Sequence, residues 1–104
     1  MRPSTHLEIR PLQADDLAAV LAIQLRCHDS TRIESAQSFD AKRRASPTSC
    51  FMARLDGRSV GYLHGLVHPA LHASGNNAWV DELWVDEDVR RRGVARALMT
   101  AFDV

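Results

Sequence analysis

The densest positive charge in the chain lies at Arg90, Arg91 and Arg92, and it runs directly into Gly93 and an apolar helical pattern. A helix N-terminus offers unpaired backbone N–H groups and the positive end of the helix dipole. A glycine at that point allows a ligand to approach the backbone closely. Because this arrangement suits phosphate, the stretch predicts a pyrophosphate-binding loop whose amides come from residues 92–96.

Two other interpretations of the same arginines stay open. They could form a solvated cap between a strand and a helix, since short basic runs are common in proteins. They could also bind nucleic acid. However, the formal net charge of the chain is zero, acidic residues crowd positions 81–88, and no aromatic residue alternates with the arginines. We therefore expect no nucleic-acid partner.

Asp81 and Glu82 are the candidate general bases, because a carboxylate near the predicted loop could take a proton from a substrate. Adjacent residues of a strand point to opposite faces of a sheet. Only one of the two is therefore expected to face the substrate, and we favour Glu82, although both could be solvated strand residues. Tyr62, the only tyrosine, is expected to pack in the core.

Three histidines, His64, His68 and His72, repeat every four residues, a spacing that would form a metal-binding face on a helix. Two neighbouring glycines and a proline argue against a helix there, so no metal site is expected. His68 or His72 could instead line a substrate entrance. Cys27 and Cys50 have no metal-binding or disulfide spacing, which favours partly buried, reduced thiols in a cytoplasmic protein.

The elements that must position these residues follow from hydrophobic periodicity. The first half is expected to form a strand at 5–12, a helix capped by Asp15 or Asp16 with apolar residues at 17, 20, 21 and 25, and a short exposed helix within 34–46. The second half is expected to form a hairpin around Asp56-Gly57, a loop at 68–77 and a strand at 78–85. The last expected element is a helix with an apolar stripe at 94, 97, 98, 101 and 102. Gly61 and Gly65 indicate a bulge or the close approach of another element. Trp79 and Trp84 are expected to pack on the sheet. The order strand, helix, helix, strand, strand, strand, helix predicts an α+β (mixed α/β) fold.

The segment ELWVDEDVRRRGVARALM resembles the acetyl-CoA-binding segment of the GNAT N-acetyltransferase superfamily, whose signature is [Q/R]-x-x-G-x-[G/A]. Arg90, Gly93 and Ala95 occupy its fixed positions, and Leu83 and Val85 match the apolar strand that precedes it. The order of elements also matches the family through its third helix. The resemblance implies a central, mostly antiparallel sheet flanked by helices.

The implied activity is transfer of an acetyl group from acetyl-CoA to an amine of a small molecule or peptide, without a metal. The implied coenzyme A-binding residues are Leu83, Val85, Arg90, Arg91, Arg92, Gly93, Val94, Ala95 and Arg96. A backbone N–H near 83–85 would polarise the thioester carbonyl, and Glu82 or Asp81 would be the base. The alternative is a catalytically deficient acetyl-CoA-binding or interaction module of the same fold.

Two departures from the family pattern shape the remaining expectations. Arg91 stands where the family often has glycine, which should stiffen the turn. The chain reaches Val104 in or just after the third helix, so we expect one shortened domain, residues 1–104, without the family's later elements. An open strand edge at 78–85 then favours a homodimer. The longest apolar run, 17–23, is too short for a membrane span, so no membrane association is expected.

Overall fold

The computed structural model describes residues 6–28, 36–45, 48–69 and 76–102 of the 104-residue chain. Its strands are β1 (Leu7–Pro11), β2 (Thr48–Leu55), β3 (Arg58–Pro69) and β4 (Asn76–Val85). They pair in the order β1-β2-β3-β4, and every pairing is antiparallel. The helices are α1 (Leu17–His28), α2 (Ala36–Arg44) and α3 (Val94–Phe102). The predicted α+β class and order of elements are confirmed.

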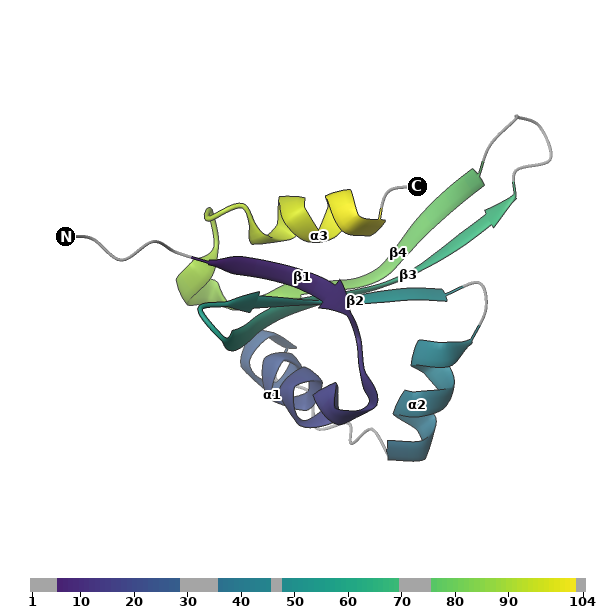
Figure 1. Cartoon of the computed structure of the whole chain (residues 1–104), viewed down its shortest axis with the longest axis horizontal. Helices are drawn as coiled ribbons and strands as arrows, with labels where there is room; N and C mark the ends of the chain where they lie inside the picture. The colour runs from purple at the N-terminus through teal and green to yellow at the C-terminus, as the bar shows by residue number, and fades with distance from the viewer. Residues whose placement is uncertain (1–5, 29–35, 46–47, 70–75, 103–104) are drawn as a thin grey trace.

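The sheet separates two hydrophobic layers. Helices α1 and α2 cover one face of the sheet, and α3 covers the other (Figure 1). The buried core on the α3 side comprises Ala53, Leu55, Val60, Leu63, Val85, Val89, Val94, Leu98 and Phe102. The core on the α1/α2 side comprises Leu12, Val20, Ile23, Phe39, Met52 and Tyr62. Strand β4 borders both layers, and it carries the carboxylates and leads into the arginine turn.

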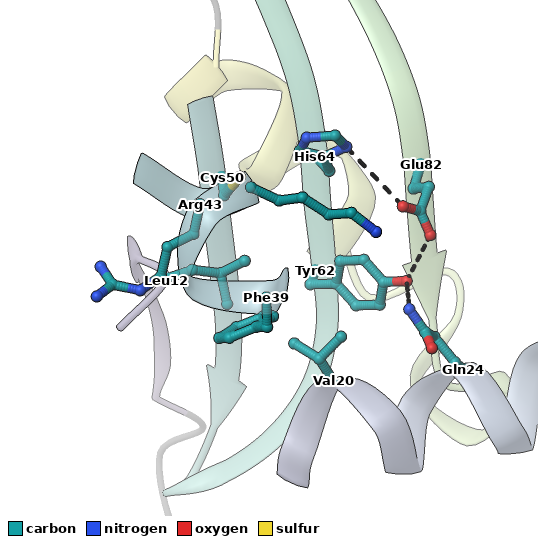
Figure 2. A pocket seen from close by; sticks show the side chains of 10 residues that line it. Leu12, Val20, Gln24, Phe39, Arg43, Cys50, Tyr62, His64 and Glu82 are labelled. Carbon is teal, nitrogen blue, oxygen red and sulfur yellow. Dashed lines mark hydrogen bonds and ion pairs between the residues drawn. The ribbon is translucent and has the colours of Figure 1, made fainter. Parts of the chain in front are cut away.

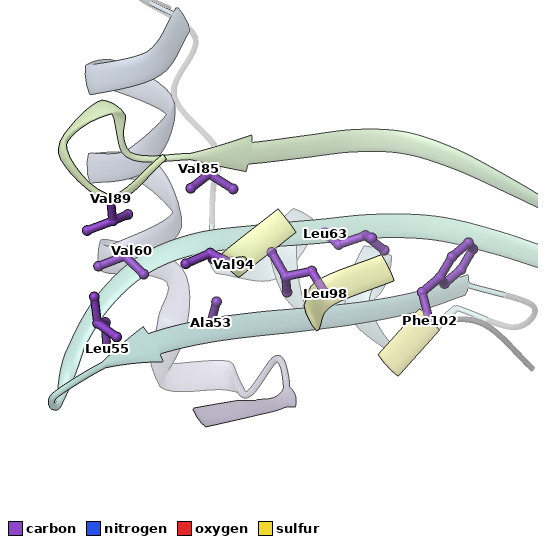
Figure 3. Packing of buried hydrophobic residues seen from close by; sticks show 9 residues of the cluster. All are labelled: Ala53, Leu55, Val60, Leu63, Val85, Val89, Val94, Leu98 and Phe102. Carbon is purple, nitrogen blue, oxygen red and sulfur yellow. The ribbon is translucent and has the colours of Figure 1, made fainter. Parts of the chain in front are cut away.

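The predicted stripe of α3 is confirmed in its buried members. Val94, Leu98 and Phe102 point towards the sheet (Figure 3). The Phe102 ring lies so close to β3 that a Cβ added to Gly65 would be 2.6 Å from it. Because no larger residue fits beneath the ring, Gly65 marks the close approach that the sequence indicated.

The predicted stripe of α1 is wrong in part. Ile23 is fully buried, whereas Leu25 is 60% exposed. The inner side of this segment instead carries Asp16, Val20 and Ile23, at spacings of four and three residues. The predicted N-cap at Asp15 or Asp16 is also replaced by a short 3-10 turn, Ala14–Asp16, which precedes the helix.

The hairpin between β2 and β3 turns at Asp56-Gly57, as predicted, with φ angles of 52° and 83°. The strands that flank the predicted loop at 68–77 are longer than expected, since β3 reaches Pro69 and β4 begins at Asn76. The second helix forms within its predicted range, although its Phe39 is buried. No helix in the described part of the chain is long and apolar enough to cross a membrane.

Strand β4 contains a bulge. His64 pairs with Glu82, but the next residue of β3, Gly65, pairs with Val80, so Asp81 is an extra residue without a counterpart. The bulge interrupts the alternation of faces along β4 and changes where the two candidate bases point.

Candidate functional site

The turn that follows β4 is anchored by a buried ion pair. Asp86 is 4% exposed and receives two hydrogen bonds from the guanidinium of Arg26 on α1, each 2.9 Å long. The hydrogen bond to Asp86 raises the pKa of Arg26. A second guanidinium, that of Arg58, lies 4.0 Å from Asp86 Oδ2. These contacts fix the start of the arginine turn to α1.

The last carbonyl of β4 is held as well. Arg90 Nε donates a hydrogen bond of 3.2 Å to the Val85 oxygen, and Cys27 Sγ donates one of 3.5 Å to the same atom. Burial raises the pKa of the Cys27 thiol, so the thiol stays protonated at neutral pH and can donate this bond. Arg90 therefore folds back on the strand and also lines the turn.

The backbone of the turn leaves amides available to a ligand. Arg91 and Gly93 have positive φ angles, 71° and 80°. The first hydrogen bond of α3 runs from the Ala97 N–H to the Gly93 carbonyl, so the amides of residues 94–96 have no carbonyl partner within the helix. A Cβ built on Gly93 would meet no atom within 4 Å, so a bound group has room to reach the backbone.

These amides border a concavity of about 480 Å³. It is lined by Val85, Val89, Arg90, Arg91, Gly93, Val94, Ala95 and Arg96. Of the predicted coenzyme A-binding residues, Leu83 and Arg92 do not line it: Leu83 packs against the α3-side core, and Arg92 is exposed. A helix N-terminus, open space at a glycine and several arginines together fit a diphosphate.

A second, smaller pocket lies on the other face of the sheet, between α1, α2 and strands β2 to β4. Its volume is about 50 Å³, and it is lined by Leu12, Val20, Gln24, Phe39, Lys42, Arg43, Cys50, Tyr62, His64 and Glu82 (Figure 2). Burial raises the pKa of the Cys50 thiol to about 11. Glu82, the favoured base, is therefore part of a pocket that the sequence did not predict.

Glu82 is oriented by a buried tyrosine. The Tyr62 hydroxyl donates a 2.9 Å hydrogen bond to Glu82 Oε1 and accepts one of 3.0 Å from Gln24 Nε2, so it lies between the two side chains (Figure 2). Tyr62 is 2% exposed, and burial raises the pKa of its hydroxyl, which keeps it neutral. The expected packing role of Tyr62 is confirmed, but its contact with Glu82 was not foreseen from the sequence.

The expectation that Asp81 and Glu82 point to opposite faces is wrong. A carboxylate oxygen of each lies 3.8 Å from His64 Nδ1. The extra residue in the bulge allows both to approach one imidazole. The other ring nitrogen of His64, Nε2, is buried and has no hydrogen-bond partner in the described part of the chain. The histidine spacing indicates His64 only as a possible metal ligand, because its position opposite Glu82 depends on strand register.

The side chain of His68 and all of His72 lie outside what the structure describes. Within the described residues, no group of three His, Cys, Asp or Glu side chains could hold a metal. Trp84 packs against the α1/α2-side core as predicted, but Trp79 is 62% exposed, so its predicted packing on the sheet is wrong.

Comparison with known proteins identifies the fold. The acetyltransferase (GNAT) family model matches residues 17–102. An aminoglycoside acetyltransferase from an uncultured soil metagenomic sample superimposes with a TM-score of 0.75 at 22% identity, covering 91% of this chain and 66% of that one. The chain thus spans about two thirds of that relative's length. No match was found among curated proteins.

Two further solved structures share the fold. The ribosomal-protein-alanine N-acetyltransferase of Brucella melitensis biovar Abortus has a TM-score of 0.69 at 23% identity, with 92% of this chain and 67% of that one covered. An aminoglycoside 6'-N-acetyltransferase of Acinetobacter baumannii has a TM-score of 0.76 at 16% identity, with coverage of 92% and 68%. At these identities the likeness concerns the fold.

Proposed function

The chain belongs to the GNAT acetyltransferase family, and we propose that it transfers an acetyl group from acetyl-CoA to an amine of a small molecule or peptide. The observation that carries the proposal is the position of two sites along β4. The concavity at the α3 N-terminus follows the strand, and Glu82 faces a separate pocket three residues before the strand ends at Val85. An anion site at the end of β4, with a carboxylate pocket further back along the same strand on the other face of the sheet, suits an enzyme that joins a phosphate-bearing donor to an amine.

Acetyl-CoA would supply the acetyl group as a thioester. The amides of residues 94–96 and the guanidinium of Arg91 would hold its diphosphate, because donors at a helix N-terminus bind anions without further rearrangement. Strand β4 is an edge strand of the described sheet, so alternate N–H groups point away from β3. One of these amides near 83–85 would stabilise the negative charge that develops on the reacting carbonyl oxygen.

Glu82 would remove the proton that the amine must lose before it attacks. Its Oε1 is held by the Tyr62 hydroxyl, and its other oxygen, Oε2, lies 3.8 Å from His64 Nδ1. A carboxylate fixed in this way needs little rearrangement to accept a proton, which is the geometry that general base catalysis requires. Asp81 does not line the pocket, so Glu82 is the stronger candidate.

The experiment that tests the donor site compares two glycines. Gly93→Asp places a negative side chain in the concavity, and the affinity for acetyl-CoA should fall at least tenfold because the carboxylate repels the diphosphate. Gly57→Asp is the matched control: Gly57 also has a positive φ and open space around it, but it lies in the β2–β3 hairpin. Isothermal titration calorimetry should show normal binding for Gly57→Asp. Equal affinities of the two variants would mean that the turn does not bind the diphosphate.

A further inference from the structure

We infer that the pocket beside Glu82 selects acceptors with a single primary amine on a short, uncharged carbon chain, and discriminates against polyamines and polycationic aminoglycosides. This inference rests on the proposed function, because it takes Glu82 as the group that receives the amine. It adds the class of acceptor. Three properties of the pocket support this class: its two chemically different ends, its volume and its charges.

The pocket is polar at one end and apolar at the other. Gln24, Tyr62, His64 and Glu82 form the polar end, and the buried side chains of Leu12, Val20 and Phe39 form the apolar end (Figure 2). The buried Nε2 of His64 has no partner in the described part of the chain, so the polar end has an unmet hydrogen bond. An amine at the polar end with hydrocarbon against the apolar end matches this division.

The volume limits the length of the hydrocarbon. The pocket measures about 50 Å³, whereas a protein cavity that binds benzene has a volume of about 150 Å³. A chain of roughly two to four carbons is therefore about as much hydrocarbon as the pocket encloses. Phe39, on α2, sets this limit at the apolar end, because it lines the pocket and is only 6% exposed.

The charges around the pocket oppose a second amine. Among the described residues that line the pocket, Glu82 is the only carboxylate, and Lys42 and Arg43 both belong to the lining. The Arg43 guanidinium lies at the end of the pocket away from Glu82 (Figure 2). Asp40, the nearest acidic residue on α2, already pairs with Arg43 and Arg44. A second ammonium group would therefore approach cations without a carboxylate of its own, which disfavours a polycation.

The first experiment compares amines with different numbers of ammonium groups on the wild-type protein. At saturating acetyl-CoA, release of the coenzyme A thiol is followed with propylamine, 1,3-diaminopropane, spermidine and kanamycin. We expect kcat/KM for propylamine to exceed that for 1,3-diaminopropane at least tenfold, because the diamine has the same three-carbon chain and adds a second ammonium group. Equal or faster acetylation of 1,3-diaminopropane, spermidine or kanamycin would overturn the inference.

A pocket variant tests the size limit. Phe39→Ala should extend the apolar end, so the ratio of kcat/KM for benzylamine to that for propylamine should rise at least tenfold. Leu25→Ala is the control, because Leu25 is exposed on the outer side of α1, and it should leave the ratio unchanged. Phe39→Leu, a smaller change, serves if the alanine variant does not fold. An unchanged ratio in a folded Phe39 variant would contradict the assignment of the apolar end.

A binding measurement separates this inference from the proposed function. Cys50 lines the pocket, so a bound amine should shield it from iodoacetamide, and peptide mapping distinguishes it from Cys27, the other cysteine. The reaction is run at pH 9, because burial raises the pKa of the Cys50 thiol to about 11 and slows alkylation at lower pH. Propylamine should slow alkylation of Cys50 at least threefold, and 1,3-diaminopropane should not.

Protection of Cys50 without any release of the coenzyme A thiol would refute the transferase activity but keep the pocket assignment. Protection by both amines, or by neither, would refute the selectivity.

Discussion

Glu82 and Asp81 are neighbours in the chain but differ in their contacts. Both approach His64, yet only Glu82 receives the Tyr62 hydrogen bond and lines the pocket. A similar distinction separates Arg91 from Arg92 in the turn. Arg91 has a φ of 71°, a conformation in which the Cβ of any residue other than glycine crowds the backbone, whereas Arg92 does not have a positive φ. The turn therefore stores strain at one arginine.

This strain predicts opposite effects of glycine at the two positions. At position 91, glycine should give a more stable protein than alanine by about 1 kcal/mol, because both substitutions remove the guanidinium but only glycine relieves the strain. At position 92, glycine should be less stable than alanine by about 0.5–1 kcal/mol, because it adds only flexibility to the unfolded chain. Urea denaturation of the four variants measures both differences. A less stable glycine variant at position 91 would show that the turn is unstrained.

Helix α1 is the element that joins the two sites. Gln24 reaches Tyr62, which holds Glu82, while Arg26 and Cys27 hold the end of β4 and the start of the arginine turn. These three residues lie within one helical turn. The pocket beside Glu82 and the arginine turn are therefore positioned by the same helix, and a change in α1 should affect both.

Breaking the Arg26–Asp86 pair should cost both stability and donor affinity. Arg26→Gln leaves the Asp86 carboxylate buried, with Arg58 at 4.0 Å as its one remaining cation in the described part of the chain. We therefore expect a loss of about 1–3 kcal/mol, moderated because Arg26 itself is half-exposed. Affinity for acetyl-CoA should also fall, because the turn loses its anchor. Chemical denaturation and calorimetry measure the two effects.

Arg44→Gln is the control, because its exposed ion pair with Asp40 on α2 should contribute less than about 0.5 kcal/mol. If Arg26→Gln behaved like Arg44→Gln in both measurements, the pair would not position the turn.

Local patterns predicted some elements better than others, for physical reasons. The stripe of α3 was predictable because the helix packs one face against the sheet and leaves the other exposed. The buried stripe of α1 was not predictable, because apolar residues lie on several sides of the helix. Only tertiary packing decides that Ile23 is buried and Leu25 is exposed. The bulge at Asp81 depends on how β3 and β4 pair, so alternation along one strand could not reveal it.

In the whole molecule, the two proposed sites, one for the donor diphosphate and one for the acceptor amine, both involve the C-terminal part of β4. The arginine turn and its glycine were recognisable from the sequence because strand, turn and helix are contiguous. The pocket was not, because its walls come from α1, α2 and three strands that only the fold brings together. Trp79, Val80 and Met99 are exposed on or near β4, an edge strand of the described sheet. The homodimer expected along this edge stays a prediction.

Thiol release and product mass with acetyl-CoA and propylamine show whether the chain is, as we claim, an acetyl-CoA-dependent N-acetyltransferase with Glu82 as its base. The wild-type protein should release thiol only when the amine is present and should yield N-acetylpropylamine. Glu82→Gln should lower the rate about 10²-fold, and Asp81→Asn less than about tenfold, because only Glu82 is held in the pocket. Acetyl-CoA binding without thiol release for any amine would contradict the claim and favour a catalytically deficient acetyl-CoA-binding module. Equal, small effects of the two substitutions would remove Glu82 from the mechanism.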